Sequence, residues 1–427
     1  MSAATEPEQS PHKSFAKVKK SELFGWCCFD FANSAFTTII ITVAFAPYFV
    51  GVVCKGNEFA NTLWATALIL SQVLVVLLSP WLGTVADLTA QKKRFLLFSA
   101  IICCFFTALL ATSVEGRILW VMCLVIGANF GFSMGENFCA SFLPEISHKG
   151  NVGKISGYGW SFGYCGGLFS LVMGIIILNF YSGRESEAVP YLCVLTACFF
   201  AASSLPTFLL LKERKLPAKG VTLTRAWNAA WREIIHTSRQ LEKHRELSYF
   251  LSCYAIYMSG LSAIFAFAAV FATQVLGFNT EENLMLFASL QLSSALGAFA
   301  FGFFQDQFGS KTMLMISLLI WVGVCFGAFA SIEKWHFFVV GNFAGFVVGS
   351  TQAGSRAVVS LMSPKGDEGQ VFGYWGLFGK LAAIIGYLSM GALADFIGFR
   401  WAVFWNSLFF IMGFLLLSKL KLKTIES

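Results

Sequence analysis

Four charged side chains lie inside otherwise apolar segments, and they are the residues of this sequence best placed to do chemistry. Two are acids and two are bases: Asp30, Glu136, Arg356 and Lys380. A charge near the centre of a bilayer-spanning helix costs roughly 2.5–3.5 kcal/mol on insertion scales, so each should face a protein interior or a water-filled cavity. At about 1.5 Å per residue, each lies about 12–15 Å from the same end of its segment. The four charges therefore predict one polar site at a common depth.

Two interpretations of these charges remain open. They can form a static network that locks parts of the protein together, since buried charges are kept when they are paired. Alternatively, they can bind a zwitterion or an anion, with one carboxylate that exchanges protons, because burial raises a carboxylate pKa and a nearby cation lowers it. In the second case the forked guanidinium of Arg356 suits a substrate carboxylate, and Asp30 is the expected proton carrier.

Further polar residues accompany the charges at helical spacing. Asp30 shares one helical face with Asn33 and Ser34, because they are three and four residues apart. Similar positions recur in the apolar segments that we expect to line the same cavity. The predicted substrate-binding or proton-coupling residues are Asp30, Asn33, Asn129, Glu136, Asn137, Tyr254, Tyr257, Gln352, Arg356 and Lys380.

Composition identifies the class of protein that must hold this site. Hydrophobic residues make up 57% of the 427 and charged residues only 12%, against about 25% charged in soluble domains. The 12 cysteines form no Cys-x-x-Cys pair, and the five histidines are scattered. We therefore expect no metal, no cofactor and no nucleic-acid partner, and no nucleophile–base set indicates an enzyme.

Twelve apolar runs are long enough to span a bilayer, which takes about 18–20 residues. They cover residues 24–53, 60–86, 95–114, 117–143, 155–180, 188–211, 247–272, 283–305, 312–331, 336–361, 370–394 and 401–419. The predicted fold is therefore an all-α membrane protein with twelve transmembrane helices.

Lys and Arg predict the orientation of these helices in the bilayer. With the N-terminus inside, 23 of the 30 basic residues are cytoplasmic, and the outer loops carry Lys55, Arg117, Arg184, Lys334 and Arg400. This bias places both termini in the cytoplasm. The first 20 residues are polar and lack the apolar core of a signal peptide. The short loops favour a bacterial plasma membrane over an organelle membrane.

The longest polar break divides the chain into two halves. The predicted parts are an N-tail (1–21), a six-helix bundle (22–211), a cytoplasmic linker (212–246), a second six-helix bundle (247–420) and a C-tail (421–427). Residues 224–247 carry tryptophans and aliphatic residues on one side and basic residues elsewhere, which is typical of an interfacial amphipathic helix. We expect a structural role for it, with regulation or partner binding as the alternative.

The two halves repeat each other. Gly83-x-x-x-Asp87, followed by Lys92 and Lys93, recurs 219 residues later as Gly302-x-x-x-Asp306, followed by Lys311. Two parallel six-helix repeats related by an axis along the membrane normal form the major facilitator architecture, and these loops resemble that superfamily's signature. The predicted conformational-gating residues are Gly83, Asp87, Lys92, Lys93, Gly302, Asp306 and Lys311, although an ordinary charged turn is the simpler interpretation.

Two glycine stripes also predict how the helices pack. They are Gly127-x-x-x-Gly131-x-x-x-Gly135 and the corresponding run over Gly341, Gly345 and Gly349. Small residues at this spacing let helix backbones approach closely. We expect these contacts within one chain rather than in a dimer, and so a monomer.

A narrower family resemblance follows from several short motifs. The run Phe29-Asp30-Phe31-Ala32-Asn33-Ser34-Ala35-Phe36 is similar to the hallmark of the major facilitator branch that includes the autophagy-related vacuolar effluxers. The other matching motifs are Ser79–Gly83, Phe142–Glu145, Ser156–Trp160 with Gly163-Tyr164, Gln352–Arg356, Pro364-Lys365 and Gly379-Lys380. This resemblance implies a secondary transporter that moves a small organic solute by alternating access through a lipid bilayer, with amino acids as the first guess and protons as the coupling ion. The alternatives are a transporter of peptides or organic acids and a non-transporting receptor or assembly factor.

Overall fold

A computed structural model describes residues 18–57, 60–148, 150–181, 185–214, 245–278, 280–364 and 368–420. In this part of the chain every regular element is a helix, so the prediction of an all-α protein is confirmed. Most of the amphipathic helix predicted within residues 224–247 falls on residues 215–244, which lie outside the described ranges.

The first six membrane segments form one bundle. It begins with a composite helix made of α1 (Lys20–Ala35), η1 (Phe36–Val43), α2 (Phe45–Tyr48) and η2 (Phe49–Val53), in which η1 and η2 are π-helical. The other members are α3 (Ala60–Thr89), α4 (Lys92–Leu109) with the 3-10 turn η3 (Leu110–Thr112), α5 (Ile118–Ala140), the short α6 (Leu143–Ile146), α7 (Val152–Phe180) and α8 (Glu185–Leu210).

The second bundle contains six uninterrupted helices. They are α10 (Arg245–Leu276), α11 (Thr280–Phe308), α12 (Ser310–Ala330), α13 (Lys334–Met362), α14 (Glu368–Ile397) and α15 (Phe399–Lys419). Two tight turns in this bundle use glycine in the left-handed region, where other residues are strained. Gly309, with φ 85°, separates α11 from α12, and Gly398, with φ 84°, separates α14 from α15.

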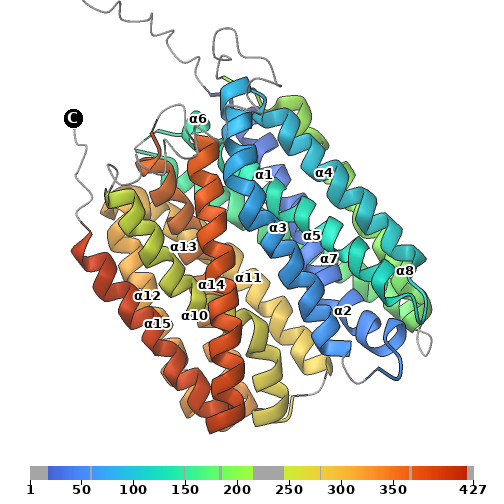
Figure 1. Ribbon diagram of the computed structural model, residues 1–427. Helices are drawn as coiled ribbons and strands as arrows, with labels where there is room; N and C mark the ends of the chain where they lie inside the picture. The colour runs from blue at the N-terminus through green and yellow to red at the C-terminus, as the bar shows by residue number, and fades with distance from the viewer. Residues whose placement is uncertain are drawn as a thin grey trace, which may run out of the picture.

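The helices have the length and polarity of membrane spans. Eleven helices of the described chain are long and apolar enough to cross a bilayer. The twelfth is α13, which has 29 residues but contains Asn342, Gln352 and Arg356 among many small residues. Both ends of the described chain lie at the same end of the molecule, as an even number of crossings requires (Figure 1). The prediction of twelve transmembrane helices is therefore confirmed.

The two bundles lie side by side, and two pairs of helices form most of the contact between them (Figure 1). In one pair α7 packs on α11, and in the other α3 packs on α14. The approach is close because glycines lie at the contacts. A Cβ atom on Gly157 would lie 2.5 Å from the Ala298 carbonyl oxygen, and one on Gly373 would lie 2.9 Å from that of Ser79.

The predicted glycine stripes also pack against neighbouring helices of the same chain. A Cβ atom on Gly131 of α5 would lie 2.6 Å from the Cys103 backbone nitrogen in α4. One on Gly349 of α13 would lie 2.1 Å from the Ser294 carbonyl oxygen in α11. The prediction of close helix packing within one chain is confirmed.

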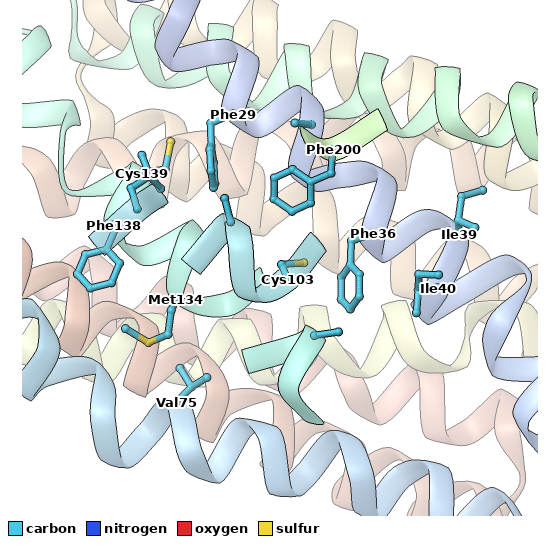
Figure 2. Packing of buried hydrophobic residues seen from close by; sticks show 14 of the residues in the cluster. Phe29, Phe36, Ile39, Ile40, Val75, Cys103, Met134, Phe138, Cys139 and Phe200 are labelled. Atoms are coloured by element: carbon cyan, nitrogen blue, oxygen red, sulfur yellow. The ribbon is translucent and has the colours of Figure 1, made fainter. Parts of the chain in front are cut away.

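Each half has its own apolar core. In the first half, Phe29 and Phe36 of the composite helix point toward α5 and α8, where Phe29 meets Phe200 edge to face with ring centroids 5.8 Å apart (Figure 2). The second half is built around fully buried residues such as Tyr257 and Trp321. These cores hold the polar face of each helix in a fixed orientation.

Candidate functional site

A buried ion pair between the halves joins α1 to α13. Arg356 Nη1 donates a hydrogen bond of 2.8 Å to Asp30 Oδ2. Only 2% of the Arg356 side chain and 11% of the Asp30 side chain are exposed. The sequence predicted that these charges share one depth, and the structure brings them together as a buried ion pair.

Helix α7 supplies the other partners of the guanidinium. Arg356 Nη2 donates a hydrogen bond of 3.0 Å to the Ser156 carbonyl oxygen, and Nε donates one of 3.3 Å to Ser156 Oγ. Gly159 lies beside the ion pair, since a Cβ atom there would be 2.5 Å from Arg356 Nη2 and 2.6 Å from Asp30 Oδ2. A glycine is therefore required at position 159 for the halves to close around the pair.

Two indole rings cover the guanidinium. The Arg356 Cζ atom lies 4.8 Å from the Trp26 ring centroid and 5.2 Å from that of Trp160. Cation–π contacts of this kind are worth about 2 kcal/mol or more when they are shielded from water. Trp26 is itself fixed, because its Nε1 donates a hydrogen bond of 2.8 Å to the Cys139 carbonyl oxygen.

A second ion pair joins the halves through α5 and α14. Lys380 Nζ lies 3.8 Å from Glu136 Oε2, with 18% and 25% of the two side chains exposed. This pair is longer and better hydrated than the Asp30–Arg356 pair. Beside it, Asn137 Nδ2 donates a hydrogen bond of 2.8 Å to Ser79 Oγ, which in turn donates one of 3.2 Å to the Gly373 carbonyl oxygen.

The remaining predicted site residues divide into two groups. Gln352 lies in the interface between the halves, where its Oε1 accepts a short hydrogen bond from the Tyr164 hydroxyl of α7. Tyr254 also lies at this level, with its ring 5.8 Å from that of Trp375. Tyr257 instead bonds Ser355 within the second half, at 2.7 Å.

Two predicted amides lie away from the charged pairs or lack a partner. Asn129 donates a hydrogen bond of 2.5 Å to Ser71 Oγ and so joins α5 to α3 inside the first half. Asn33 is buried, and its Oδ1 atom has no hydrogen-bond partner among the residues that the structure describes. Sequence reasoning missed the part played by Ser156 and Trp26, although Ser156 begins the matched motif Ser156–Trp160.

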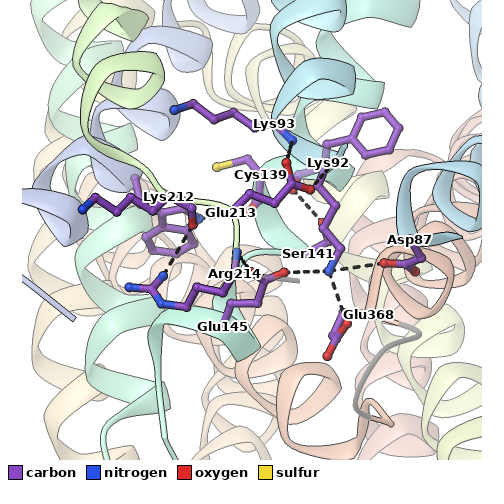
Figure 3. A network of polar contacts seen from close by, with 12 residues as sticks. Asp87, Lys92, Lys93, Cys139, Ser141, Glu145, Lys212, Glu213, Arg214 and Glu368 are labelled. Carbon is purple, nitrogen blue, oxygen red and sulfur yellow. Dashed lines mark hydrogen bonds and ion pairs between the residues drawn. The ribbon is translucent and has the colours of Figure 1, made fainter. Parts of the chain in front are cut away.

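A third polar cluster lies at the end of the molecule where both ends of the chain lie (Figure 3). Lys92 Nζ lies 3.3 Å from Asp87, 2.9 Å from Glu145 and 3.2 Å from Glu368, and the Lys92 side chain is fully buried. Because Glu368 opens α14, the Lys92–Glu368 contact crosses between the halves. Lys92 was predicted at this rim as a gating residue, but its complete burial was not foreseen.

The start of the linker is bound to the same cluster (Figure 3). Glu213 accepts hydrogen bonds from the backbone N–H groups of Lys92 and Lys93, at 2.5 and 3.4 Å, and so caps α4. Lys93 Nζ donates to the Leu211 carbonyl oxygen, at 2.6 Å. Burial raises the pKa of the Glu213 carboxyl above its ordinary value, and the two backbone donors partly oppose this rise.

Arg214 extends this attachment to the first helix. Its two terminal nitrogens donate hydrogen bonds of 2.6 and 2.7 Å to the two Glu22 carboxylate oxygens of α1. Its backbone N–H donates to Glu145 Oε2, at 3.3 Å. The linker therefore begins as a fixed part of the first bundle.

The second copy of the gating motif makes different contacts from the first. Asp306 accepts hydrogen bonds from the N–H groups of Gly153 and Lys154, at 2.9 and 3.0 Å, and so caps α7 of the other half. Lys311 Nζ donates to the carbonyl oxygens of Ser418 and Leu420 at the end of α15.

The glycines of the two gating motifs lie at packed positions. Gly302 packs against Gly153 and Gly157 of the opposite half, and Gly83 is buried in α3. Across the described ranges no group of three or more His, Cys, Asp or Glu side chains could hold a metal ion.

Comparisons with known proteins agree with this geometry. The family model described as "Vacuole effluxer Atg22 like" matches residues 60–424. The uncharacterized MFS-type transporter YxiO of Bacillus subtilis (strain 168) is 24% identical over 418 residues, which are 95% of each protein. Autophagy-related protein 22-2 of Penicillium rubens is 25% identical over 296 residues, 62% of this chain and 48% of that protein, so the chain spans about half of that relative's length.

A solved structure gives the fold. The major facilitator superfamily proton:xylose symporter XylE superimposes with a TM-score of 0.73 and 13% identity, over 93% of this chain and 94% of that one. The prediction of a major facilitator fold is confirmed.

Proposed function

The chain belongs to the family of Atg22-like vacuole effluxers, and on that premise we propose that it couples the movement of a small zwitterionic solute, with amino acids first, to protons across a membrane. Membership confirms the prediction of a multi-pass secondary transporter of the major facilitator superfamily rather than an enzyme. The relative XylE is described as a proton symporter, and the family description names vacuolar efflux. Both descriptions motivate the proposal for this chain.

The observation that carries the proposal is the buried pair of Asp30 and Arg356. It connects α1 of the first half to α13 of the second half by a hydrogen-bonded ion pair of 2.8 Å. Alternating access requires the halves to separate on one side at a time, so this contact must break in each cycle. Protonation of Asp30 removes its charge and so weakens the pair, which gives protons a way to drive the separation.

The net charge of the interior supports a zwitterion over a simple ion. The four intramembrane charges form two pairs of opposite sign and sum to zero. An added zwitterion keeps the sum at zero, whereas an anion or cation leaves an uncompensated charge in a medium of low dielectric. An organic acid remains a second candidate, because a proton taken up by Asp30 would compensate its charge.

Orientation and environment follow the sequence-based expectations. We propose that the end carrying Lys92 and the linker faces the cytoplasm, that the protein works as a monomer and that it resides in a bacterial plasma membrane. The bacterial relative matches over 95% of its length, in contrast to the fungal one. A receptor or assembly factor would have no need for hydrated charges between the halves.

Reconstituted protein tests the proposal. Proteoliposomes are assayed with labelled amino acids, dipeptides and organic acids, with and without a pH gradient. We expect gradient-dependent uptake of at least one zwitterion and its loss in Asp30→Asn. The matched control is Lys334→Gln, which removes an exposed ion pair with Glu282 far from the site. Uptake of no compound, or uptake in Asp30→Asn that still responds to the gradient, refutes the proposal.

A further inference from the structure

We infer that the two charged groups of the transported zwitterion bind between Glu136 and Lys380. Its ammonium group contacts Glu136 and its carboxylate contacts Lys380. The inference rests on the proposed function and adds the residues that recognise the substrate. It also separates the two buried ion pairs by role: the Glu136–Lys380 pair exchanges with substrate, and the Asp30–Arg356 pair holds the halves together.

Arg356 is poorly placed to bind a substrate carboxylate in this state. Each of its three nitrogens already donates a hydrogen bond to the protein, on Asp30 or Ser156. The Trp26 and Trp160 rings also pack against the guanidinium, and only 2% of the side chain is exposed. An incoming carboxylate would have to displace Asp30 and would leave a buried acid without its partner, which is costly.

The second pair has the opposite properties. Glu136 and Lys380 are 3.8 Å apart, beyond the usual range of a hydrogen bond, and neither side chain forms a hydrogen bond with any of the described residues. About a fifth of each side chain is exposed, at 25% and 18%. A zwitterion that enters between them replaces one long contact by two charge-assisted hydrogen bonds.

The two side chains of this pair meet at the interface between the halves. Glu136 comes from α5 of the first half and Lys380 from α14 of the second, and they meet across that interface. Tyr254 lies next to them, since a Cβ atom on Gly379 would be 3.0 Å from its hydroxyl oxygen. Its ring packs on Trp375, whose buried Nε1 atom finds no acceptor among the described residues. Two neutral donors therefore lie on the residues around the pair.

The internal repeat explains why two pairs exist with different properties. Glu136 and Arg356 are 220 residues apart, the same offset as Pro144 and Pro364, so they occupy corresponding positions on α5 and α13. Asp30 corresponds to Tyr254 at an offset of 224. Arg356 therefore meets a carboxylate from the first helix of the other half, whereas Glu136 faces a tyrosine at the corresponding place. Of Glu136 and Arg356, only Glu136 has an ionic partner, Lys380, that a substrate can replace.

Analogues that lack one charge test the assignment. The probes are L-phenylalanine, 3-phenylpropionate without the ammonium group and 2-phenylethylamine without the carboxylate, each as a competitor of uptake of the best-transported amino acid. In wild-type protein we expect the zwitterion to compete about tenfold to a hundredfold better than either analogue, the range for one hydrogen bond to a charged group. Lys380→Gln should lose the preference for L-phenylalanine over 2-phenylethylamine. Glu136→Gln should lose the preference for L-phenylalanine over 3-phenylpropionate.

Native protein provides a second measurement in case these variants do not fold. Reductive methylation of lysines is followed by mass spectrometry, and L-phenylalanine and 3-phenylpropionate should protect Lys380 several-fold while 2-phenylethylamine does not. Lys334, on the exposed pair, is the internal control and should react equally in all samples. Folded variants that keep the wild-type preferences, or unprotected Lys380, overturn the inference and leave the proposed function intact. A wild-type protein that transports no zwitterion overturns both.

Discussion

The contact between Lys92 and Glu368 should hold the halves together at the end that carries the linker. Their charged atoms are 3.2 Å apart, and 0% and 10% of the side chains are exposed. The variant Glu368→Gln removes only the charge that comes from the second half and leaves Lys92 with Asp87 and Glu145. It therefore tests the contact between halves without leaving a buried lysine unpaired.

The expected magnitude follows from the burial of the pair. A hydrogen bond to a charged group contributes about 1.5–3 kcal/mol, and about 1.4 kcal/mol changes an equilibrium constant tenfold. Losing the Glu368 charge should therefore shift the balance between closed and open forms of this end by about tenfold to a hundredfold toward the open form. Lys92→Met should be far more disruptive, because three buried carboxylates then lose the Lys92 ammonium group, at a cost of about 3–5 kcal/mol for one broken pair alone.

Spin labels measure this shift directly. Exposed positions His148 and Lys419 lie on different halves at the relevant end, and pulsed electron resonance gives the distribution of distances between them. The matched control is Glu22→Gln, which removes an equally buried ion pair with Arg214 that does not connect the bundles. If Glu368→Gln leaves the distribution unchanged, or if Glu22→Gln broadens it equally, the contact does not control closure.

Three further predictions follow from single positions. Gly159→Ala should abolish gradient-driven uptake, because its Cβ atom would lie 2.5 Å from Arg356 Nη2. The control Gly323→Ala, whose Cβ atom would have no neighbouring atom within 4 Å, should transport normally. Both variants are checked by their gradient-driven uptake and their melting temperature. The raised pKa of Glu213 means that the folded protein binds its proton more tightly than the unfolded chain. Stability should therefore fall as pH rises from the ordinary value of 4.5 through the raised pKa, and Glu213→Gln should flatten that slope in thermal unfolding scans. Cysteines at Glu115 and His148 test orientation: an impermeant thiol reagent should label only position 115 from outside intact cells, and the reverse pattern contradicts the proposed topology.

The sequence predicted the elements better than the contacts between them. Twelve apolar runs were enough to find the membrane helices, because hydropathy over about 20 residues is a strong and local signal. The composite first helix was expected as one span, and the π-helical segments over Phe36–Val43 and Phe49–Val53 were not foreseen. That segment contains the β-branched run Thr37–Val43 and Pro47, whereas α10, in the corresponding place of the second half, has no such run and no proline.

Pairing of charges could not be read from spacing. Asp30, Glu136, Arg356 and Lys380 were placed at one depth, but which acid meets which base depends on helix rotation and on glycines such as Gly159 in a third helix. The backbone carbonyl of Ser156 carries no sequence signal as an acceptor. Lys92 was expected at a charged rim, and it is buried only because Asp87, Glu145 and Glu368 come together from three distant parts of the chain.

The contacts between the halves differ in how readily they can break, and this difference bears on how substrate binding can drive transport. The Lys92 cluster and the Asp30–Arg356 pair are tight and nearly dry, whereas the Glu136–Lys380 pair is long and hydrated. A ligand shifts a conformational equilibrium only by its difference in affinity for the two states. A substrate that replaces the Glu136–Lys380 contact removes one ionic link between the halves and leaves the two tight ionic links, so substrate alone is not enough to open this end. Protonation of Asp30 weakens the second link, and the remaining rim cluster then sets the barrier. Coupling of solute to proton follows from this order of contact strengths, because neither event by itself releases enough of the interface.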